Sequence, residues 1–130
     1  MLNKMYSLPE LCFVGGSSEN FEFNLYYDKS NPRPFDIYGG KAEFSIVNLA
    51  NKNGTPIFSK SMEIAQGDTH GETDTCHNVV RVSLLPEDTV DLFGKFVYQV
   101  TLADADGNID PHQGIVVIHR NINKTFIKNQ

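Results

Sequence analysis

The sequence predicts an all-β fold, a sandwich of two sheets with about seven strands. Seven short segments alternate apolar and polar residues with a period of two, which is the pattern of strands that bury one face. Residues that favour turns, such as Gly, Pro, Asn and Asp, separate these segments at short intervals. The length of 130 residues, with 40% hydrophobic and 21% charged residues, suits one globular domain.

The alternating segments define the predicted strands and the predicted core. Their ranges are 11–15, 21–27, 41–47, 57–64, 79–84, 95–103 and 115–118. The clearest alternation is in 95–103, where Phe96, Tyr98 and Val100 share one face. The residues expected in the core are Phe23, Phe44, Ile46, Val82, Leu84, Phe96, Tyr98, Val100 and Ile118.

Three of these segments depart from simple alternation. In 57–64 an inward-facing Lys60 interrupts the apolar face, which is typical of an edge strand protected from aggregation. The segment 115–118 is apolar on both faces, so it lies in the middle of a sheet or contacts a second surface. Cys12 lies in the apolar stretch 11–14 and is expected in the core as a reduced thiol, and Cys76 is also expected to be reduced.

Turn and helix signals lie between the strands. Asn53-Gly54 and Asp106-Gly107 each predict a hairpin, because both pairs tolerate the positive φ of a type I′ turn. Residues 86–93 predict a short helical turn, since Pro86 stands at its start, acids follow, and Gly94 ends it. In a sandwich, such a segment commonly carries the chain from one sheet to the other.

The chain divides into an N-terminal arm (1–10), one domain (11–122) and a C-terminal tail (123–130). Eleven Lys and Arg against 16 Asp and Glu give a net charge of −5, which argues against nucleic acid as a partner. The sequence has no apolar run long enough to cross a membrane, and its N-terminus lacks the features of a secretory signal. We therefore expect neither a nucleic-acid nor a membrane partner.

Two polar segments contain metal-ligating residue types, but neither has the spacing of a known metal site. Residues 66–78 include His70, Cys76 and His77, yet they match no zinc pattern. The series Asp104, Asp106, Asn108, Asp110 departs from a calcium loop at its sixth and twelfth positions. No nucleophile, phosphate-binding or metalloprotease motif occurs, so the sequence predicts no catalytic residue, no metal and no cofactor.

Three tyrosines offer a different kind of site. Tyr26, Tyr27 and Tyr38 could form an aromatic platform for a sugar, although aromatic residues on strands more often pack within the sheet. A carbohydrate- or cell-surface-binding module is therefore the alternative functional prediction.

A resemblance to a known family carries the functional prediction further. The motifs are L-x-P-E-D-T at 84–89, G-K-F-V-Y-Q-V at 94–100, D-x-D-G-N at 104–108 and G-I-V-V-I at 114–118. This succession resembles the Ig-like domains of tailed-phage virion proteins, and most closely the N-terminal domain of phage baseplate upper proteins. The segments 41–47 and 53–60 also fit, so the resemblance covers residues 15–122 approximately.

The resemblance implies an Ig-like β-sandwich and a non-enzymatic structural or assembly protein of a phage or prophage tail, in the baseplate. Its partners would be other tail or baseplate proteins, and its location the virion, assembled in the bacterial cytoplasm. Apolar residues of the last strand and tail form the expected interaction surface, which comprises Ile115, Val117, Ile122, Phe126 and Ile127. Rings of repeated copies also make a homo-oligomer an expectation; the open alternative is a monomer whose tail folds back on its own sheet.

Overall fold

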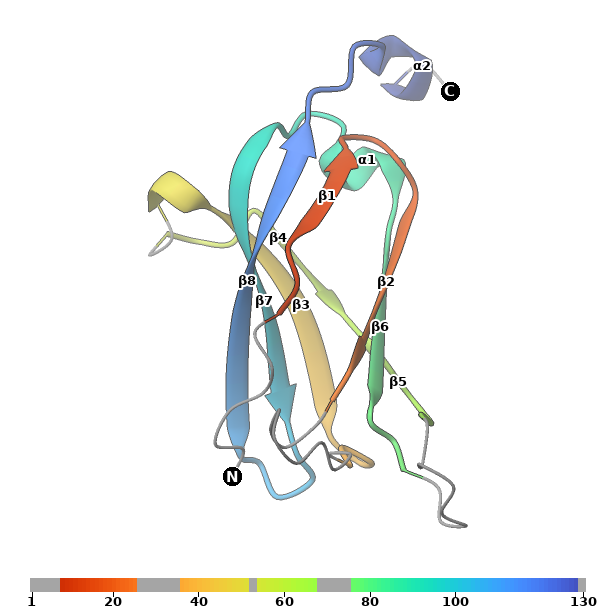
Figure 1. The fold of residues 1–130 in the computed structure, drawn as a ribbon, viewed down its shortest axis with the longest axis vertical. Helices are drawn as coiled ribbons and strands as arrows, with labels where there is room; N and C mark the ends of the chain where they lie inside the picture. Colours follow the sequence, from red (N-terminus) through yellow and green to blue (C-terminus); the bar gives the residue numbers. More distant parts are fainter. Residues whose placement is uncertain (1–7, 26–35, 52–53, 68–75, 129–130) are drawn as a thin grey trace.

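The computed structural model describes residues 8–25, 36–51, 54–67 and 76–128, which form two sheets packed face to face (Figure 1). The five-stranded sheet has the order β1 (Leu11–Val14), β8 (Ile109–His119), β7 (Gly94–Ala103), β3 (Lys41–Asn48), β4 (Phe58–Ser61). The three-stranded sheet has the order β2 (Glu19–Asn24), β6 (Val79–Leu84), β5 (Glu63–Ala65).

The strand order is that of an Ig-like sandwich. β2, β6 and β5 take the places of strands B, E and D, and β8, β7, β3 and β4 take those of G, F, C and C′. β1 pairs parallel with β8, and every other pair in the two sheets is antiparallel. The predicted all-β, two-sheet, Ig-like fold is thereby confirmed.

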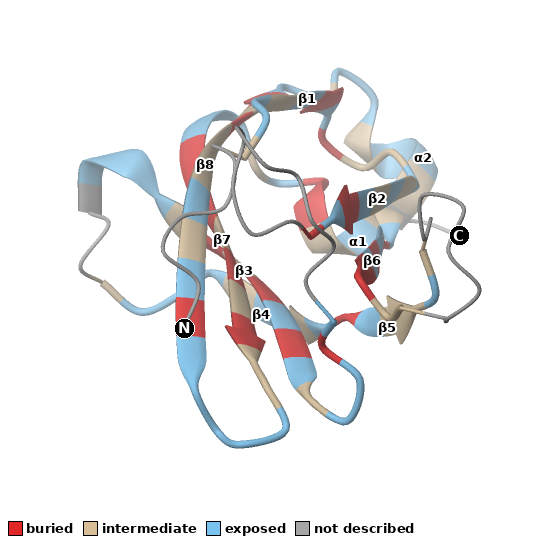
Figure 2. Cartoon of the chain, turned by 60° about the horizontal axis from the view of Figure 1, so that its bottom comes forward, coloured by how far each residue is buried: buried red, intermediate tan, exposed pale blue. Residues whose placement is uncertain are grey.

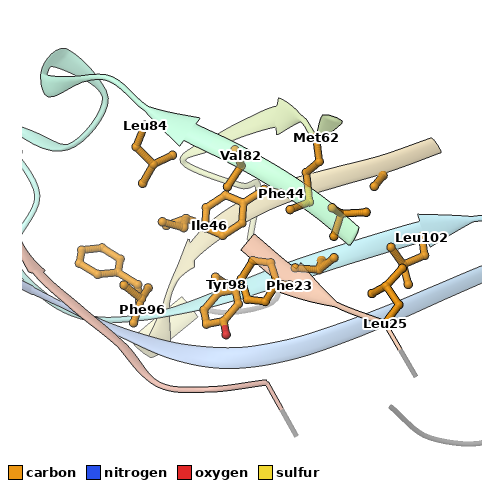
Figure 3. Close-up of a cluster of buried hydrophobic side chains, with 14 of the residues drawn as sticks. Phe23, Leu25, Phe44, Ile46, Met62, Val82, Leu84, Phe96, Tyr98 and Leu102 are labelled. Atoms are coloured by element: carbon orange, nitrogen blue, oxygen red, sulfur yellow. The ribbon is translucent and has the colours of Figure 1, made fainter. Parts of the chain in front are cut away.

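The core lies between the two sheets, where the inward faces of their strands meet (Figure 2). All nine residues predicted for the core are buried. Aromatic rings fill its middle: Phe44 stacks on Tyr98 with centroids 5.6 Å apart, and Phe23 lies 5.8 Å from Tyr98 (Figure 3). Period-two alternation thus identified the buried face of the strands correctly.

The predicted strand 57–64 is two strands in different sheets. β4 pairs with β3 in the five-stranded sheet, whereas β5 pairs with β6 in the three-stranded sheet. The chain crosses between the sheets at Met62, which is buried and donates its backbone N–H to the carbonyl of Ala42. β4 is an edge strand, as Lys60 predicted, and Lys60 shares the inward side with its register partner Phe44.

The prediction that Cys12 belongs to the core is wrong, because Cys12 is exposed. β1 alternates like the other strands, with Phe13 buried and Cys12 and Val14 on the opposite, outer side. The run of four apolar residues concealed this alternation, since Val14 is also apolar but is 47% exposed.

β8 is longer than the predicted segment 115–118 and lies between β1 and β7. The apolar character of 115–118 predicted either a place in the middle of a sheet or a contact with a second surface, and the structure shows the first. Val116 and Ile118 face the core, while Ile115 and Val117 lie half-buried on the outer face.

Short helices and turns connect the strands. α1 (Pro86–Thr89) is shorter than the predicted 86–93, and it connects the three-stranded sheet to the five-stranded sheet. η1 (Leu49–Asn51) follows β3, and α2 (Lys124–Lys128) lies in the tail; neither was predicted. The hairpin predicted at Asp106-Gly107 joins β7 to β8, with Gly107 at a φ of 90°.

Asn53 of the other predicted hairpin lies outside the described residues, although β3 and β4 do pair antiparallel. In the part of the chain that the structure describes, no helix has the length and apolar character to cross a membrane.

Candidate interaction surfaces

The five residues predicted to form one interaction surface lie in two separate places. Ile115 and Val117 are on the outer face of the five-stranded sheet, half-buried. Ile122, Phe126 and Ile127 are beyond the end of β8, at the end of the sandwich near α1 (Figure 1). The five residues therefore belong to two separate surfaces.

The tail and the residues that join it to β8 fold back against the end of the sandwich through a few specific contacts. Asn121 donates its Nδ2–H to the carbonyl of Gly15 at 2.7 Å, and Lys124 lies 3.5 Å from the carboxylate of Asp91. A Cβ built on Gly16 would come within 2.4 Å of Cδ1 of Ile127, so Ile127 rests directly on that glycine. The tail thus contacts the turn after β1, helix α1 and the residues that follow α1.

Large apolar side chains remain exposed around this docked tail. We call Val14, Phe93, Ile122 and Phe126 the terminal surface; Ile122 is 97% exposed and Phe126 67%. A hollow of about 880 Å³ lies between the tail and the turn after β1, with Val14 and Phe126 on its lining. Exposed apolar groups gathered at one end of a domain are typical of a protein contact.

Cations accompany the terminal surface. The guanidinium carbon of Arg120 lies 4.3 Å from the centroid of the Phe93 ring, a cation–π contact that holds both side chains at this end. Lys124 is near by in α2, paired with Asp91. Carboxylates are also present at this end, since Glu87 and Asp91 line the same hollow as Val14 and Phe126.

The outer face of the five-stranded sheet is different in character. Its central side chains are polar but uncharged, and they bond to one another across strands: Gln113 donates to Gln99 at 3.0 Å, and the hydroxyls of Ser45 and Ser59 lie 2.9 Å apart. Val97 also points to this outer side, opposite Ile115, yet only 6% of it is exposed. A hollow of about 210 Å³ lies over Val97 and Gln99, bordered by Gly54 and Pro56.

The three-stranded sheet has a charged outer face instead. Arg81 in the middle strand β6 bonds to Glu22 of β2 at 2.6 Å and to Glu63 of β5 at 3.2 Å. Hydrogen bonding to Glu22 and its charge raise the pKa of Arg81. Charges linked across strands in this way are typical of a surface that faces water.

Of the three tyrosines predicted as a sugar platform, only Tyr38 can be placed. Tyr26 and Tyr27 lie outside the described residues. Tyr38 is 69% exposed, and its ring lies 4.7 Å from that of His77. Asp36 holds the two residues together, since its Oδ1 accepts the backbone N–H of Tyr38 at 3.0 Å and of His77 at 3.2 Å. Gln66 completes the lining of an open hollow of about 450 Å³.

The two segments with metal-ligating residue types have different outcomes. Most of 66–78, including His70, lies outside the described residues. In the β7–β8 turn, Asp104 accepts the backbone N–H groups of Asp106 and Asn108 and the amide of Asn108. These hydrogen bonds lower the pKa of Asp104, and they account for its place in the turn without an ion.

One pair of ligand types was missed by the sequence analysis. The thiol of Cys12 lies 3.3 Å from Nε2 of His119, although the two residues are 107 positions apart. The parallel pairing of β1 with β8 brings them together. Nowhere in the described ranges do three or more His, Cys, Asp or Glu side chains gather as a metal site would require.

Comparison with known proteins gives structural likeness only. No protein-family model matches the sequence. No curated protein matches it either. Among solved structures, CopC from Methylosinus trichosporium OB3b is 14% identical, with 87% of each chain covered and a TM-score of 0.43.

Two further solved structures have still lower TM-scores. Murine CRIg is 10% identical, with coverage of 91% of this chain and 97% of that chain and a TM-score of 0.36. AggA, the major subunit of aggregative adherence fimbriae type I from Escherichia coli, is 13% identical, with coverage of 91% and 93% and a TM-score of 0.34. At these values the likeness carries no functional argument, and the fold assignment rests on the strand order.

Proposed function

We propose that this chain is a non-enzymatic structural protein of a phage or prophage tail, a baseplate component that is assembled in the bacterial cytoplasm and resides in the virion. The observation that carries the proposal is the terminal surface, where four large apolar side chains are exposed and one of them, Phe93, lies under Arg120. The motifs that resemble baseplate Ig-like domains indicate the class of partner. These motifs fall in β6, α1, β7, the β7–β8 turn and β8. They therefore include two neighbouring strands of the five-stranded sheet and the connection between the two sheets.

The proposed mechanism is docking by a preformed end of a rigid sandwich. Ile122 and Phe126 would enter an apolar depression on the neighbouring tail protein, since both side chains extend beyond the sandwich. Arg120 would meet a carboxylate at the rim, which sets orientation more than affinity, whereas Lys124 is already paired with Asp91 of this chain. No bond is made or broken, so binding is the entire activity.

Complementation of a strain lacking this gene tests the proposal. The variants Ile122→Asp and Phe126→Ser alter exposed side chains, so folding should be preserved, while the amount of this chain in purified tailed particles should fall about tenfold or more. The matched control is Ile109→Asp, which changes another exposed isoleucine, 60% exposed, where β8 begins at the far end of the sandwich. Normal incorporation of both terminal-surface variants would refute the proposed docking end.

Tyr38 supports a second candidate, a carbohydrate- or cell-surface-binding module. An exposed aromatic ring beside a carboxylate, an amide and an imidazole is a suitable arrangement for stacking on a sugar and bonding to its hydroxyls. A glycan array with the wild-type chain, Tyr38→Ala and the control Phe93→Ala separates the candidates. Specific glycan binding that is lost in Tyr38→Ala and kept in Phe93→Ala would favour this second function.

A further inference from the structure

The outer face of the five-stranded sheet lacks charged side chains over its centre. Its outward residues from β8, β7, β3 and β4 are Pro111, Gln113, Ile115, Val117, Val97, Gln99, Thr101, Ser45, Val47, Ile57, Ser59 and Ser61. The charged side chains on this face border its centre: Lys95 lies at one end, and Lys41 and Glu43 lie at the other, where Glu43 stands between its register partners Thr101 and Ser61. Depletion of charge is the feature that separates the core of an interface from ordinary surface.

We propose that this uncharged face binds a second copy of the chain in a two-fold symmetric dimer. A two-fold contact uses the same patch of both copies. Any carboxylate in the patch would therefore bring negative charge to the contact from both sides. With a net charge of −5, most of the molecule is unsuited to such a contact. The other sheet is an example, because Glu22 and Glu63 cover its outer face.

The shape of the face allows it to pack against the same face of a second copy. Along the β4 side, Pro56 and Ile57 form an exposed apolar border, and Pro56 also lines the hollow over Val97. Along the β8 side, Ile115 and Val117 are half-buried. A two-fold axis parallel to the strands places the border of one copy against β8 of the other. The same apolar contact then occurs at two places in the dimer.

The size of the face predicts a weak dimer. With its charged border included, the face has four strands spaced about 4.8 Å apart over about seven residues of about 3.4 Å each, which gives roughly 500 Å² per copy. The total of about 1,000 Å² lies at the lower limit for a specific interface, so association should depend on concentration in the micromolar range. Because charges are absent from the centre, association should change little between low and high salt.

Sedimentation velocity of the full chain from about 5 to 500 µM tests the proposal. We expect the wild type to shift from monomer to dimer over this range. Gln113→Glu and Ser59→Glu each add two carboxylates to the dimer face at exposed positions, so both variants should stay monomeric. Each loses one exposed cross-strand hydrogen bond, so both should stay folded with only a small decrease in melting temperature. The control Asn24→Asp adds the same charge to the exposed side of β2 and should dimerise like the wild type.

Three results would overturn the proposal: a wild-type monomer at every concentration, a dimer that persists in both variants, or equal loss of the dimer in Asn24→Asp. The inference does not depend on the proposed tail function. Ile122→Asp should leave the dimer intact while it reduces incorporation into particles, so the failure of one proposal is distinguishable from the failure of the other.

Discussion

The ring of Tyr98 lies over Gly114, its register partner in the neighbouring strand β8. A Cβ on Gly114 would come within 2.7 Å of the ring, and the hydroxyl of Tyr98 donates a hydrogen bond to the carbonyl of Pro9. The same ring stacks on Phe44 in the core. Gly114 therefore provides the space in which Tyr98 joins the segment before β1 to the centre of the sandwich.

Gly114→Ala should destabilise the fold. The added methyl group must displace a fully buried ring that is held on its other sides, and overpacking of this kind costs about 1–3 kcal/mol. Urea denaturation measures the change, with the exposed neighbour Gln113→Ala as a control that should cost less than about 0.5 kcal/mol. Equal stability of Gly114→Ala and wild type would show that the ring can move aside.

Tyr98 also predicts a loss of stability at high pH. Burial raises the pKa of Tyr98 above its usual value of about 10 in an unfolded chain. The folded state then favours the protonated phenol, so its contribution is complete below pH 10 and declines as the pH rises above that value.

Denaturation at pH 8 and at pH 10.5 measures this dependence. Tyr98→Phe should be about 1 kcal/mol less stable at pH 8, because it loses the hydrogen bond to Pro9. The variant should also have a smaller decrease between the two pH values. A decrease as steep as that of wild type would assign the effect to other groups.

Lys60 and Asp88 form an ion pair that connects the edge strand β4 to α1. The ammonium lies 2.5 Å from Oδ2 of Asp88, with side-chain exposures of 25% and 17%, and the same oxygen accepts the backbone N–H of Leu85. Because both side chains are partly shielded from water, we expect about 1–2 kcal/mol of loss for Lys60→Met or Asp88→Asn. A double-mutant cycle with a coupling energy near zero would contradict this view of the pair.

Cys12 should react with a thiol reagent in the folded state. It is exposed beside His119 on the outer side of β1, so labelling should proceed without unfolding. Mass spectrometry of the labelled chain should show that Cys12→Ser removes this labelling of the folded state, while the labelling of Cys76 is unchanged. A reaction that starts only in denaturant would instead support the original expectation of a buried Cys12.

Sequence reasoning succeeded where period-two alternation was complete and failed where pairing partners decide the outcome. The core residues of β7, such as Tyr98 and Val100, could be read from alternation alone. The crossing at Met62 could not, because Ser61 and Met62 carry no turn signal and the change of sheet depends on what each half pairs with. Cys12 was misplaced because its neighbours are all apolar, so alternation had no polar residue to reveal it.

The interaction surfaces needed the fold even more. Ile115 and Ile122 were grouped as one predicted interaction surface because both are apolar, but sequence pattern alone cannot separate a residue on a sheet face from one at the end of the sandwich. The uncharged character of the outer face appears only once the order β8, β7, β3, β4 is known. The pair Cys12 and His119 likewise depends on the parallel contact of the first strand with the last.

If this chain is a structural component of a phage or prophage tail, as we propose, purified tails must contain it. Quantitative mass spectrometry of tailed particles, purified by density gradient from the bacterium that carries the gene, measures this content. We expect peptides of this chain at a fixed ratio to the other tail proteins, retained when tails are separated from capsids. Intact particles without these peptides, while the chain is abundant in the same cells, would contradict it.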